Sequence, residues 1–375
     1  MDVILGAGMT GLSAGIKTGA VIYEASDKVG GICRSYYQDG FRFENGGGHW
    51  IFGMTEKSKS FIEKYVSLKE YRRKAGVYYN QMIDYPIQAY FDREEGFYSN
   101  SMKGWLYNKF GGDQCRMFFF PFNEKYTDGL YDSVIQDDPH KSPDPKASGY
   151  NDTFYYPKDV GLDVLADRMA EGLDIRFNKQ VTRINLAFRV VYFSDGTAQA
   201  YDRLISTLPL KATMKLAGIY DEAEDNLPHT SVVVLNIGAI KGENCPDKHW
   251  VYIPSPNVPF FRVGFYSNVD ESFADGDKRV SIYVERAFQD YDPDFSTQLY
   301  AQEVERQLKA WGWIENVKTV SVSHVPHAYT WLKPNHQREQ NIADLLEKYG
   351  ILSTGRYGVW KFCGISESIE MGLAV

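Results

Sequence analysis

The first part of the chain alternates short apolar runs with helical spacing. Residues 3–5 are an apolar run that predicts a buried strand, and residues 20–23 form a second one after a glycine-rich stretch. Apolar residues at 61, 62, 65 and 66 predict a helix over residues 54–80, followed by a turn into a strand ending at Ile83. Residues 100–135 are rich in aromatic side chains, and their pattern does not assign them to helix or strand.

The second half is dominated by strand patterns. Short strands flank the Asp195-Gly196 pair, which predicts a hairpin within residues 175–207. Apolar runs at residues 232–235 and 250–253, and alternation at Val280, Ile282 and Val284, predict an antiparallel sheet. Two amphipathic helices follow, and we expect the second to stop at Gly350; their apolar stripes are Tyr300, Val304, Leu308 and Trp311, then Ile342, Leu345, Leu346 and Tyr349.

Composition and charge exclude several classes of protein. The 375 residues carry a formal net charge of −8 and no Lys/Arg cluster, so we expect no nucleic-acid partner. No run of 18 apolar residues is present, so we expect no membrane span. A strand starting at Val3 leaves no room for a signal peptide. Four dispersed cysteines without a CxxC pair predict reduced thiols in a cytoplasmic protein and no metal site; they are Cys33, Cys115, Cys245 and Cys363.

Aromatic residues make up 15% of the chain, with more Tyr than Phe. Tyrosine combines an apolar ring with a polar hydroxyl, so this excess fits either generous packing or a site lined by stacking rings. Composition alone leaves both open.

Gly6, Gly8 and Gly11 form a G-x-G-x-x-G motif between the first strand and a helix. Gly6 permits the tight turn, Gly8 lets the backbone approach a pyrophosphate, and Gly11 lets the helix pack on the strand. Glu24 ends the second strand, where a carboxylate can accept hydrogen bonds from a ribose diol. The combination predicts a Rossmann-type dinucleotide-binding domain.

A second group of glycines favours FAD over a nicotinamide cofactor. Gly30-Gly31, followed by Arg34 and Ser35, resembles the Gly-Gly motif of amine-oxidase-like FAD proteins. Gly47 and Gly48 precede His49, and a strand passing flat against a flavin ring needs positions without Cβ. His49 is therefore expected at the cofactor edge, with a satisfied core histidine as the alternative.

These patterns together predict an α/β fold with a discontinuous FAD-binding domain. We expect it to comprise residues 1–53, 152–215 and 350–375, with a mainly helical insertion at 54–151 and an antiparallel-sheet substrate domain at 216–349. Residues 136–148 contain three prolines and five charged side chains, which predicts a loop that is either a linker or a flap over a site.

Several further segments resemble the UDP-galactopyranose mutase family, especially its eukaryotic type. They run in order along nearly the whole chain: residues 84–88 (DYPIQ), 121–123 (PFN), 151–157 (NDTFYYP), 250–254 (WVYIP), 259–262 (PFFR), 266–268 (YSN) and 355–361 (GRYGVWK). The resemblance implies a cytoplasmic isomerase of cell-surface polysaccharide synthesis that forms UDP-galactofuranose. In that family, N5 of the reduced FAD attacks the anomeric carbon of a UDP-sugar and displaces UDP.

The resemblance also implies roles for individual residues. His49, Arg262 and Arg356 would be catalytic, with the two arginines clamping the diphosphate and Arg356 also touching FAD. The uridine and sugar would be held by Phe52, Tyr85, Gln88, Asn123, Asn151, Trp250, Tyr252 and Tyr329. Each ring has core packing as its alternative, and each arginine a structural ion pair.

The sequence departs from the family pattern after Trp360. A tyrosine expected to bind phosphate is replaced by Phe362, and the segment that follows is shorter and lacks an asparagine. These changes fall at the diphosphate and sugar end, so the sugar of this enzyme need not be galactose.

Two other functions remain open at this stage. One is an amine-oxidase-like FAD oxidoreductase, which would consume an electron acceptor with its substrate. The other is a non-catalytic protein that binds flavin and a nucleotide sugar. The sequence leaves the oligomeric state undefined.

Overall fold

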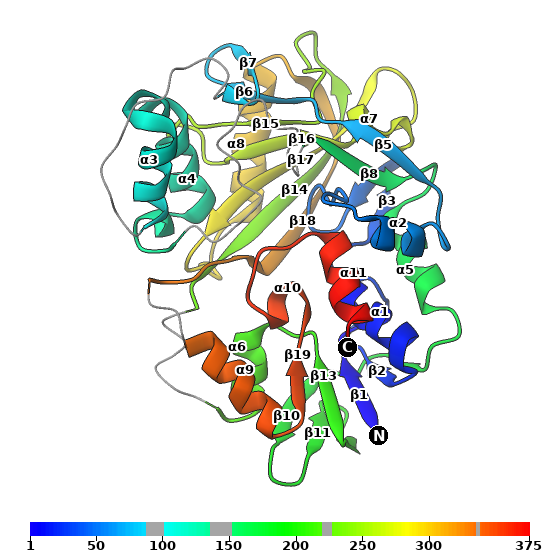
Figure 1. Ribbon diagram of the computed structural model, residues 1–375. Helices are drawn as coiled ribbons and strands as arrows, with labels where there is room; N and C mark the ends of the chain where they lie inside the picture. Colours follow the sequence, from blue (N-terminus) through cyan, green and yellow to red (C-terminus); the bar gives the residue numbers. More distant parts are fainter. Residues whose placement is uncertain (88–100, 136–151, 220–226, 335–337) are drawn as a thin grey trace.

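The computed structural model describes residues 1–87, 101–135, 152–219, 227–334 and 338–375. It has a lower part built on a parallel sheet and an upper part built on a larger, mostly antiparallel sheet (Figure 1). Both termini lie in the lower part, the N-terminus at the start of β1 and the C-terminus beside α1 (Met9–Thr18). The predicted α/β fold is confirmed.

The lower sheet has five parallel strands in the order β19-β13-β1-β2-β9. Its central strand is buried on both faces, as the apolar run at residues 3–5 requires. α1, α5 (Leu162–Ala170) and α11 (Ile365–Leu373) pack together beside this sheet. The strands are β1 (Asp2–Leu5), β2 (Val21–Tyr23), β9 (Ile175–Arg176), β13 (Arg203–Ser206) and β19 (Ile351–Ser353).

The remaining elements of the lower part are a small antiparallel sheet and two helices. Gly196 turns the predicted hairpin between the last two strands of the small sheet. Gly350, with φ at 75°, ends the second predicted helix region as expected. The elements are β10 (Val181–Asn185), β11 (Val190–Phe193), β12 (Ala198–Ala200), α6 (Leu210–Leu216), α9 (Arg338–Lys348) and α10 (Gly355–Gly358).

The upper sheet has seven strands in the order β18-β14-β17-β16-β15-β6-β7, and only the β15–β6 pair is parallel. α8 (Thr297–Ala310) covers one face through Tyr300, Val304 and Leu308, the stripe predicted from the sequence. The strands are β6 (Ala75–Tyr78), β7 (Met82–Asp84), β14 (His229–Lys241), β15 (Trp250–Tyr252), β16 (Arg262–Phe265), β17 (Arg279–Phe288) and β18 (Ile314–Thr330).

The aromatic-rich middle of the chain is helical and forms its own core. Phe110 and Phe119 stack at 3.9 Å between ring centroids within this core. The helices lie at one side of the upper sheet (Figure 1); they are α3 (Met102–Gln114), the π-helix η2 (Cys115–Phe119), α4 (Phe120–Thr127) and the 3-10 helix η3 (Leu130–Asp132).

Two two-stranded antiparallel sheets and short helices connect the two parts. β3 (Ser35–Gln38) pairs with β4 (Phe41–Glu44), and β5 (Leu68–Arg72) pairs with β8 (Thr153–Pro157). The helices here are α2 (Glu56–Ile62), α7 (Tyr266–Val269) and the 3-10 helix η5 (Glu271–Phe273).

The structure differs from the predicted domain boundaries at one point. Residues 54–87 contain one short helix and three strands, and two of these strands, β6 and β7, extend the upper sheet. Among the described residues of the predicted insertion, helices occupy most of 102–132, whereas α2 is the only helix in residues 54–87. The β15–β6 pairing joins segments far apart in sequence, which periodicity cannot reveal.

The loop predicted at 136–148 lies outside the described residues. No helix in the described ranges combines the length and apolarity needed to span a bilayer.

Candidate active site

A cavity of about 700 Å³ lies where the two parts and the helical segment meet. Its walls come from the loops after β1, β2 and β13, from the upper sheet, from α3 and α4, and from residues 355–368. Fifteen of the predicted site residues line it: Gly6, Gly8, Glu24, Gly30, Gly31, Gly48, His49, Phe52, Tyr85, Asn123, Trp250, Tyr252, Arg262, Tyr329 and Arg356. The fold therefore brings most of the predicted site together.

One end of the cavity is shaped by backbone. Gly6 has a φ of 94°, a left-handed conformation that glycine adopts without strain. A Cβ on Gly11 would lie 1.9 Å from the Gly6 carbonyl oxygen, so the absent side chain is what lets α1 reach β1. A Cβ on Gly8 would meet nothing within 4 Å, because it would point into the cavity. The three glycines thus occupy the positions that a pyrophosphate-binding turn requires.

Glu24 lies at this same end, with its carboxylate already oriented. Its Oε2 accepts from the Ala7 backbone N–H at 2.7 Å, and its Oε1 accepts from Ser26 N–H at 2.9 Å. The first residues of α1 and of α11 also border the cavity, and helix amino termini favour anionic groups. This end can hold a diphosphate and a ribose.

Arg34, Ser35 and Gly47 were predicted to contact the cofactor but do not line the cavity. Arg34 donates to Asp167 at 2.9 Å and to the Val29 carbonyl at 2.9 Å. Ser35 Oγ donates to the buried Glu44 at 2.7 Å and accepts from the Leu162 N–H at 3.0 Å. Their side chains join strands and helices around the site.

Close packing explains why three glycines precede His49. A Cβ on Gly48 would lie 2.3 Å from the Tyr283 hydroxyl, and one on Gly47 would lie 3.2 Å from Glu285. The segment therefore passes tightly under β17, and His49 turns toward the cavity. Its Nδ1 lies 3.0 Å from the Gly47 carbonyl oxygen, so Nδ1–H donates and Nε2 is left as an acceptor.

The protonation of His49 follows from its surroundings. Burial and the nearby Arg356 guanidinium lower the pKa of His49 to about 4. The imidazole is therefore neutral at physiological pH.

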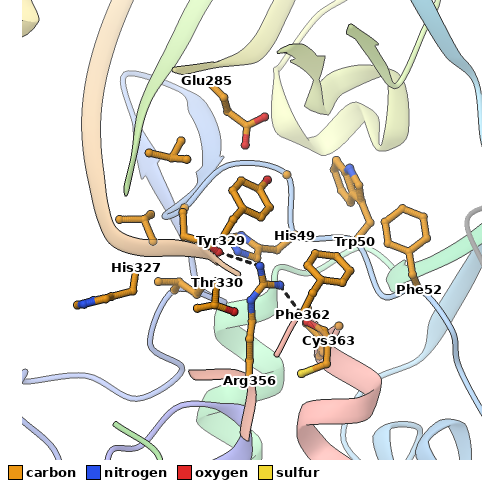
Figure 2. A pocket seen from close by; sticks show the side chains of 18 of the residues that line it. His49, Trp50, Phe52, Glu285, His327, Tyr329, Thr330, Arg356, Phe362 and Cys363 are labelled. Carbon is orange, nitrogen blue, oxygen red and sulfur yellow. Dashed lines mark hydrogen bonds between the residues drawn. The ribbon is translucent and has the colours of Figure 1, made fainter. Parts of the chain in front are cut away.

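Arg356 lies between the carboxyl-terminal segment and β18. Its Nη1 donates to the Cys363 carbonyl at 2.9 Å, and its Nη2 donates to the Ala328 carbonyl at 2.8 Å. In Figure 2 these bonds hold the guanidinium between Tyr329 and Phe362. Its buried Nε has no hydrogen-bond partner in the described part of the chain. Because carbonyls fix the group without cancelling its charge, it can still bind an anion.

Arg262 begins β16 and faces the buried Glu285 on β17. Its Nε and Nη2 both donate to the Glu285 carboxylate, the second at 2.8 Å, and Nη2 also donates to the Tyr329 hydroxyl at 3.2 Å. Glu285 is 3% exposed, so this pair is shielded from water. The predicted alternative of an ion pair is thus present, although Arg262 also lines the cavity.

The opposite end of the cavity is lined by rings. Phe52 packs edge-on against Trp250 at 6.1 Å, and Tyr85 lies 5.2 Å from Tyr252, between ring centroids. Asn123 borders the same space but donates its amide to the Phe119 carbonyl at 2.7 Å. Gln88 and Asn151, also predicted for this site, lie outside the described residues.

Sequence reasoning missed several residues that line the cavity. β17 is buried on both faces, so the sequence shows no polar side of this strand to which Glu285 could be assigned. For that reason Glu285 was not predicted as a site residue. Arg73 and Cys363 lie outside the recognised motifs, and Asp152 lies in the NDTFYYP segment, to which no role was assigned at that position. Aromatic residues of the helical segment also line the cavity, although the sequence pattern did not assign that segment to helix or strand: Trp105, Phe110, Phe118, Phe119, Phe122 and Tyr126. In the described ranges, no three His, Cys, Asp or Glu side chains gather as a metal site would need.

A model of the family of flavin containing amine oxidoreductases matches residues 9–81 and 73–327. The chain belongs to this family. Membership implies a flavin, and the cavity supplies what the dinucleotide part of FAD needs: the open position at Gly8, the oriented Glu24 carboxylate and two helix amino termini.

Solved structures show how widely this fold is used. A reduced UDP-galactopyranose mutase is 22% identical and superposes with a TM-score of 0.86, over 99% of this chain and 92% of that one. A putrescine oxidase bound to putrescine has 16% identity and a TM-score of 0.70, covering 100% and 97% of the two chains. A CLA-producing fatty acid isomerase from P. acnes has 15% identity and a TM-score of 0.68, with the same coverage. At these identities the likeness establishes the flavoenzyme fold alone.

Proposed function

We propose that this flavoenzyme is a FAD-dependent nucleotide-sugar mutase that interconverts pyranose and furanose forms of a UDP-sugar, most simply UDP-galactose. The observation that carries the proposal is the convergence of Arg262, Arg356 and Tyr329 on one cavity. Arg262 hydrogen-bonds the Tyr329 hydroxyl, and the Arg356 guanidinium carbon lies 5.7 Å from the Tyr329 ring centroid. Two guanidinium groups and a phenol suit a diphosphate leaving group.

The charges of this clamp are unequal. Glu285 neutralises Arg262, so Arg356 is the group with uncancelled positive charge. A departing diphosphate would take hydrogen bonds from both arginines and from Tyr329, while its charge would be met mainly by Arg356. The developing charge is stabilised where water is excluded, which makes each bond stronger than at a surface.

When bound at this site, reduced FAD would supply the nucleophile for displacement of the diphosphate. The chain supplies position and proton control. Neutral His49 keeps its Nε2 as a hydrogen-bond acceptor at the cavity, and the Phe52, Tyr85, Trp250 and Tyr252 rings offer stacking surfaces for a base. In this proposal the product enters the synthesis of cell-surface polysaccharide.

The test compares the two redox states of one preparation. Dithionite-reduced holoenzyme should interconvert UDP-galactopyranose and UDP-galactofuranose, and the oxidised holoenzyme should not. Chromatography of the two UDP-sugars measures the conversion. Equal conversion in both states would contradict the proposal. Consumption of an electron acceptor with an amine would instead support an oxidoreductase.

Binding measurements test the clamp separately from turnover. Arg356→Ala should weaken UDP binding by about 2–4 kcal/mol, since charged hydrogen bonds in a shielded site are strong. A loss well below about 1 kcal/mol, as for a rim charge, would mean that Arg356 is structural.

The sugar is tested with a panel of UDP- and dTDP-sugars. The Phe362 ring lies 4.7 Å from the Arg356 guanidinium carbon and has no hydroxyl to offer a phosphate or sugar. A preference for another sugar would agree with this change, and Phe362→Tyr should then shift the preference toward UDP-galactose.

A further inference from the structure

Arg73 and Asp152 bring opposite charges side by side at the aromatic end of the cavity. Arg72 pairs with Thr153 in the β5–β8 ladder, and the next residue on each strand continues that register: the Arg73 N–H donates to the Asp152 carbonyl at 2.9 Å. Directly opposed residues of an antiparallel pair project their side chains to the same face, with Cβ atoms about 5 Å apart. Both residues line the cavity.

The Arg73 and Asp152 side chains do not pair with each other despite their proximity. Within the described ranges, no ion pair or side-chain hydrogen bond involves the Arg73 guanidinium or the Asp152 carboxylate. The guanidinium carbon lies 5.0 Å from the Tyr85 ring centroid, which orients the group without using its N–H donors. The Arg73 N–H donors and the Asp152 carboxylate acceptors thus lie next to each other at the cavity wall.

The surrounding surface is made of flat rings. Phe52, Tyr85, Trp250 and Tyr252 line the same cavity. β15, which carries two of these rings, pairs with β6 immediately after Arg73, so Trp250 lies opposite Ala75. Rings that stack on a planar ligand, together with an adjacent donor and acceptor, are what recognition of a nucleobase requires.

We propose that Arg73 and Asp152 determine base specificity by reading the Watson–Crick edge of uracil, a role that rests on the nucleotide-sugar function proposed above. The Asp152 carboxylate accepts the N3–H of the base, and the Arg73 guanidinium donates to the neighbouring O4 carbonyl oxygen. Cytosine is rejected twice: its N3 carries no hydrogen and faces the carboxylate, and its amino group faces the guanidinium. An unmet donor or acceptor in such a site is costly, which makes the rejection strong.

The experiment measures competition for a fluorescent UDP on the FAD-loaded, dithionite-reduced protein, using UDP, CDP and pyrophosphate. The wild type should prefer UDP to CDP by about tenfold or more, as expected for a paired base contact. Asp152→Asn should reduce this preference by about threefold or more, because an amide can either accept from uracil N3–H or donate to cytosine N3, while Arg73 still opposes the cytosine amino group. Its affinity for pyrophosphate should not change.

Matched controls are available on the same strands and surface. Arg73→Met should weaken UDP and spare pyrophosphate, while Arg73→Lys should restore part of the UDP affinity. Arg72→Met changes the exposed neighbour, and Asp247→Asn removes an exposed carboxylate paired with Lys74; both should leave the UDP:CDP ratio unchanged. Flavin content and circular dichroism check that each variant is folded.

The outcomes separate this inference from the function on which it rests. UDP binding that Arg356→Ala weakens, with a UDP:CDP ratio that Asp152→Asn leaves unchanged, would overturn the base-reading role alone. Failure of the wild type to bind UDP in either redox state would overturn both. Equal loss of UDP, CDP and pyrophosphate in Asp152→Asn would also contradict the role, because reading a base edge cannot affect a ligand without a base.

Discussion

The two ends of the cavity are built in different ways. At the dinucleotide end, Gly6, Gly8 and Gly11 act through backbone geometry, and Glu24 is oriented by backbone N–H groups. At the ring-lined end, side chains from β15, β16 and α4 converge with Arg73, which directly follows β5. The first end depends on one short stretch of sequence, whereas the second depends on how distant segments pair.

This difference explains why one fold serves several chemistries. A site made of backbone accepts the same cofactor as long as the turn is kept. A site made of side chains changes its ligand with each substitution, while the fold is retained. A mutase, an amine oxidase and a fatty acid isomerase can therefore share this fold.

The largest effect is expected at the backbone end, from Gly11→Ala. The new Cβ would lie 1.9 Å from the Gly6 carbonyl oxygen, and backbone cannot move aside as a flexible side chain can. We expect a loss of more than about 4 kcal/mol in unfolding free energy and of bound flavin, measured by urea denaturation and the flavin absorbance ratio. Gly8→Ala is the control, because it should lower flavin content alone. Equal stability of the two variants would contradict the packing role of Gly11.

At the side-chain end, Glu285→Leu should destabilise the protein by about 3 kcal/mol, because it leaves Arg262 without its shielded partner. The double variant Arg262→Met/Glu285→Leu should recover most of this loss, since no uncompensated charge remains. Thermal or urea unfolding of the single and double variants measures the coupling. Additive losses would show that the pair does not hold the site together.

Stability should fall as pH drops from about 6.5 toward 4. Burial lowers the pKa of His49, His229 and His249 to about 4, so the unfolded chain takes up protons in this window that the fold excludes. Burial raises the pKa of Glu44 to about 7, so its contribution is present at low pH and is lost as pH rises from 4.5 through 7. The contribution of Glu44 thus opposes that of the histidines, and it reduces the slope of unfolding free energy against pH by the equivalent of about one proton.

His249→Asn tests this balance away from the cavity. It should lower the slope of unfolding free energy against pH by about 1.4 kcal/mol per pH unit between pH 6 and 5. Urea titrations at several pH values measure the slope, with Glu44→Gln as the variant that should steepen it. An unchanged slope in His249→Asn would mean that this histidine titrates normally in the fold.

The smallest effect is expected from Arg34→Gln, which tests a residue predicted to bind the cofactor. Its guanidinium is paired with Asp167, whose side chain is 55% exposed. Removing such a pair should cost less than about 1 kcal/mol and should leave flavin affinity nearly unchanged. Asp167→Asn should give the same result. A large loss of flavin would instead support the role inferred from sequence.

Local motifs predicted the cofactor end well. The α/β fold, the glycine turn between β1 and α1, the Asp195-Gly196 hairpin and the α8 stripe are all present, because each depends on neighbours within a few residues. Resemblance supplied Arg262, Arg356 and Tyr329, which periodicity alone would not have singled out. The functions of these residues stay predictions until the variants are measured.

What could not be predicted depended on pairing between distant strands. Glu285 lies within an apolar strand, and its importance appears only when β16 brings Arg262 beside it. Arg73 and Asp152 become neighbours only through the β5–β8 ladder. Arg34 and Ser35 illustrate the opposite case, since a recognisable motif placed them near the cofactor while packing directed their side chains elsewhere.

The sequence by itself determined the dinucleotide turn, because its requirements are conformational and are met by glycines a few positions apart. Only the tertiary structure decided which charges face the cavity and which are neutralised around it. The reason is physical: backbone conformation is set by local sterics, whereas the environment of a charge depends on every segment that folds around it.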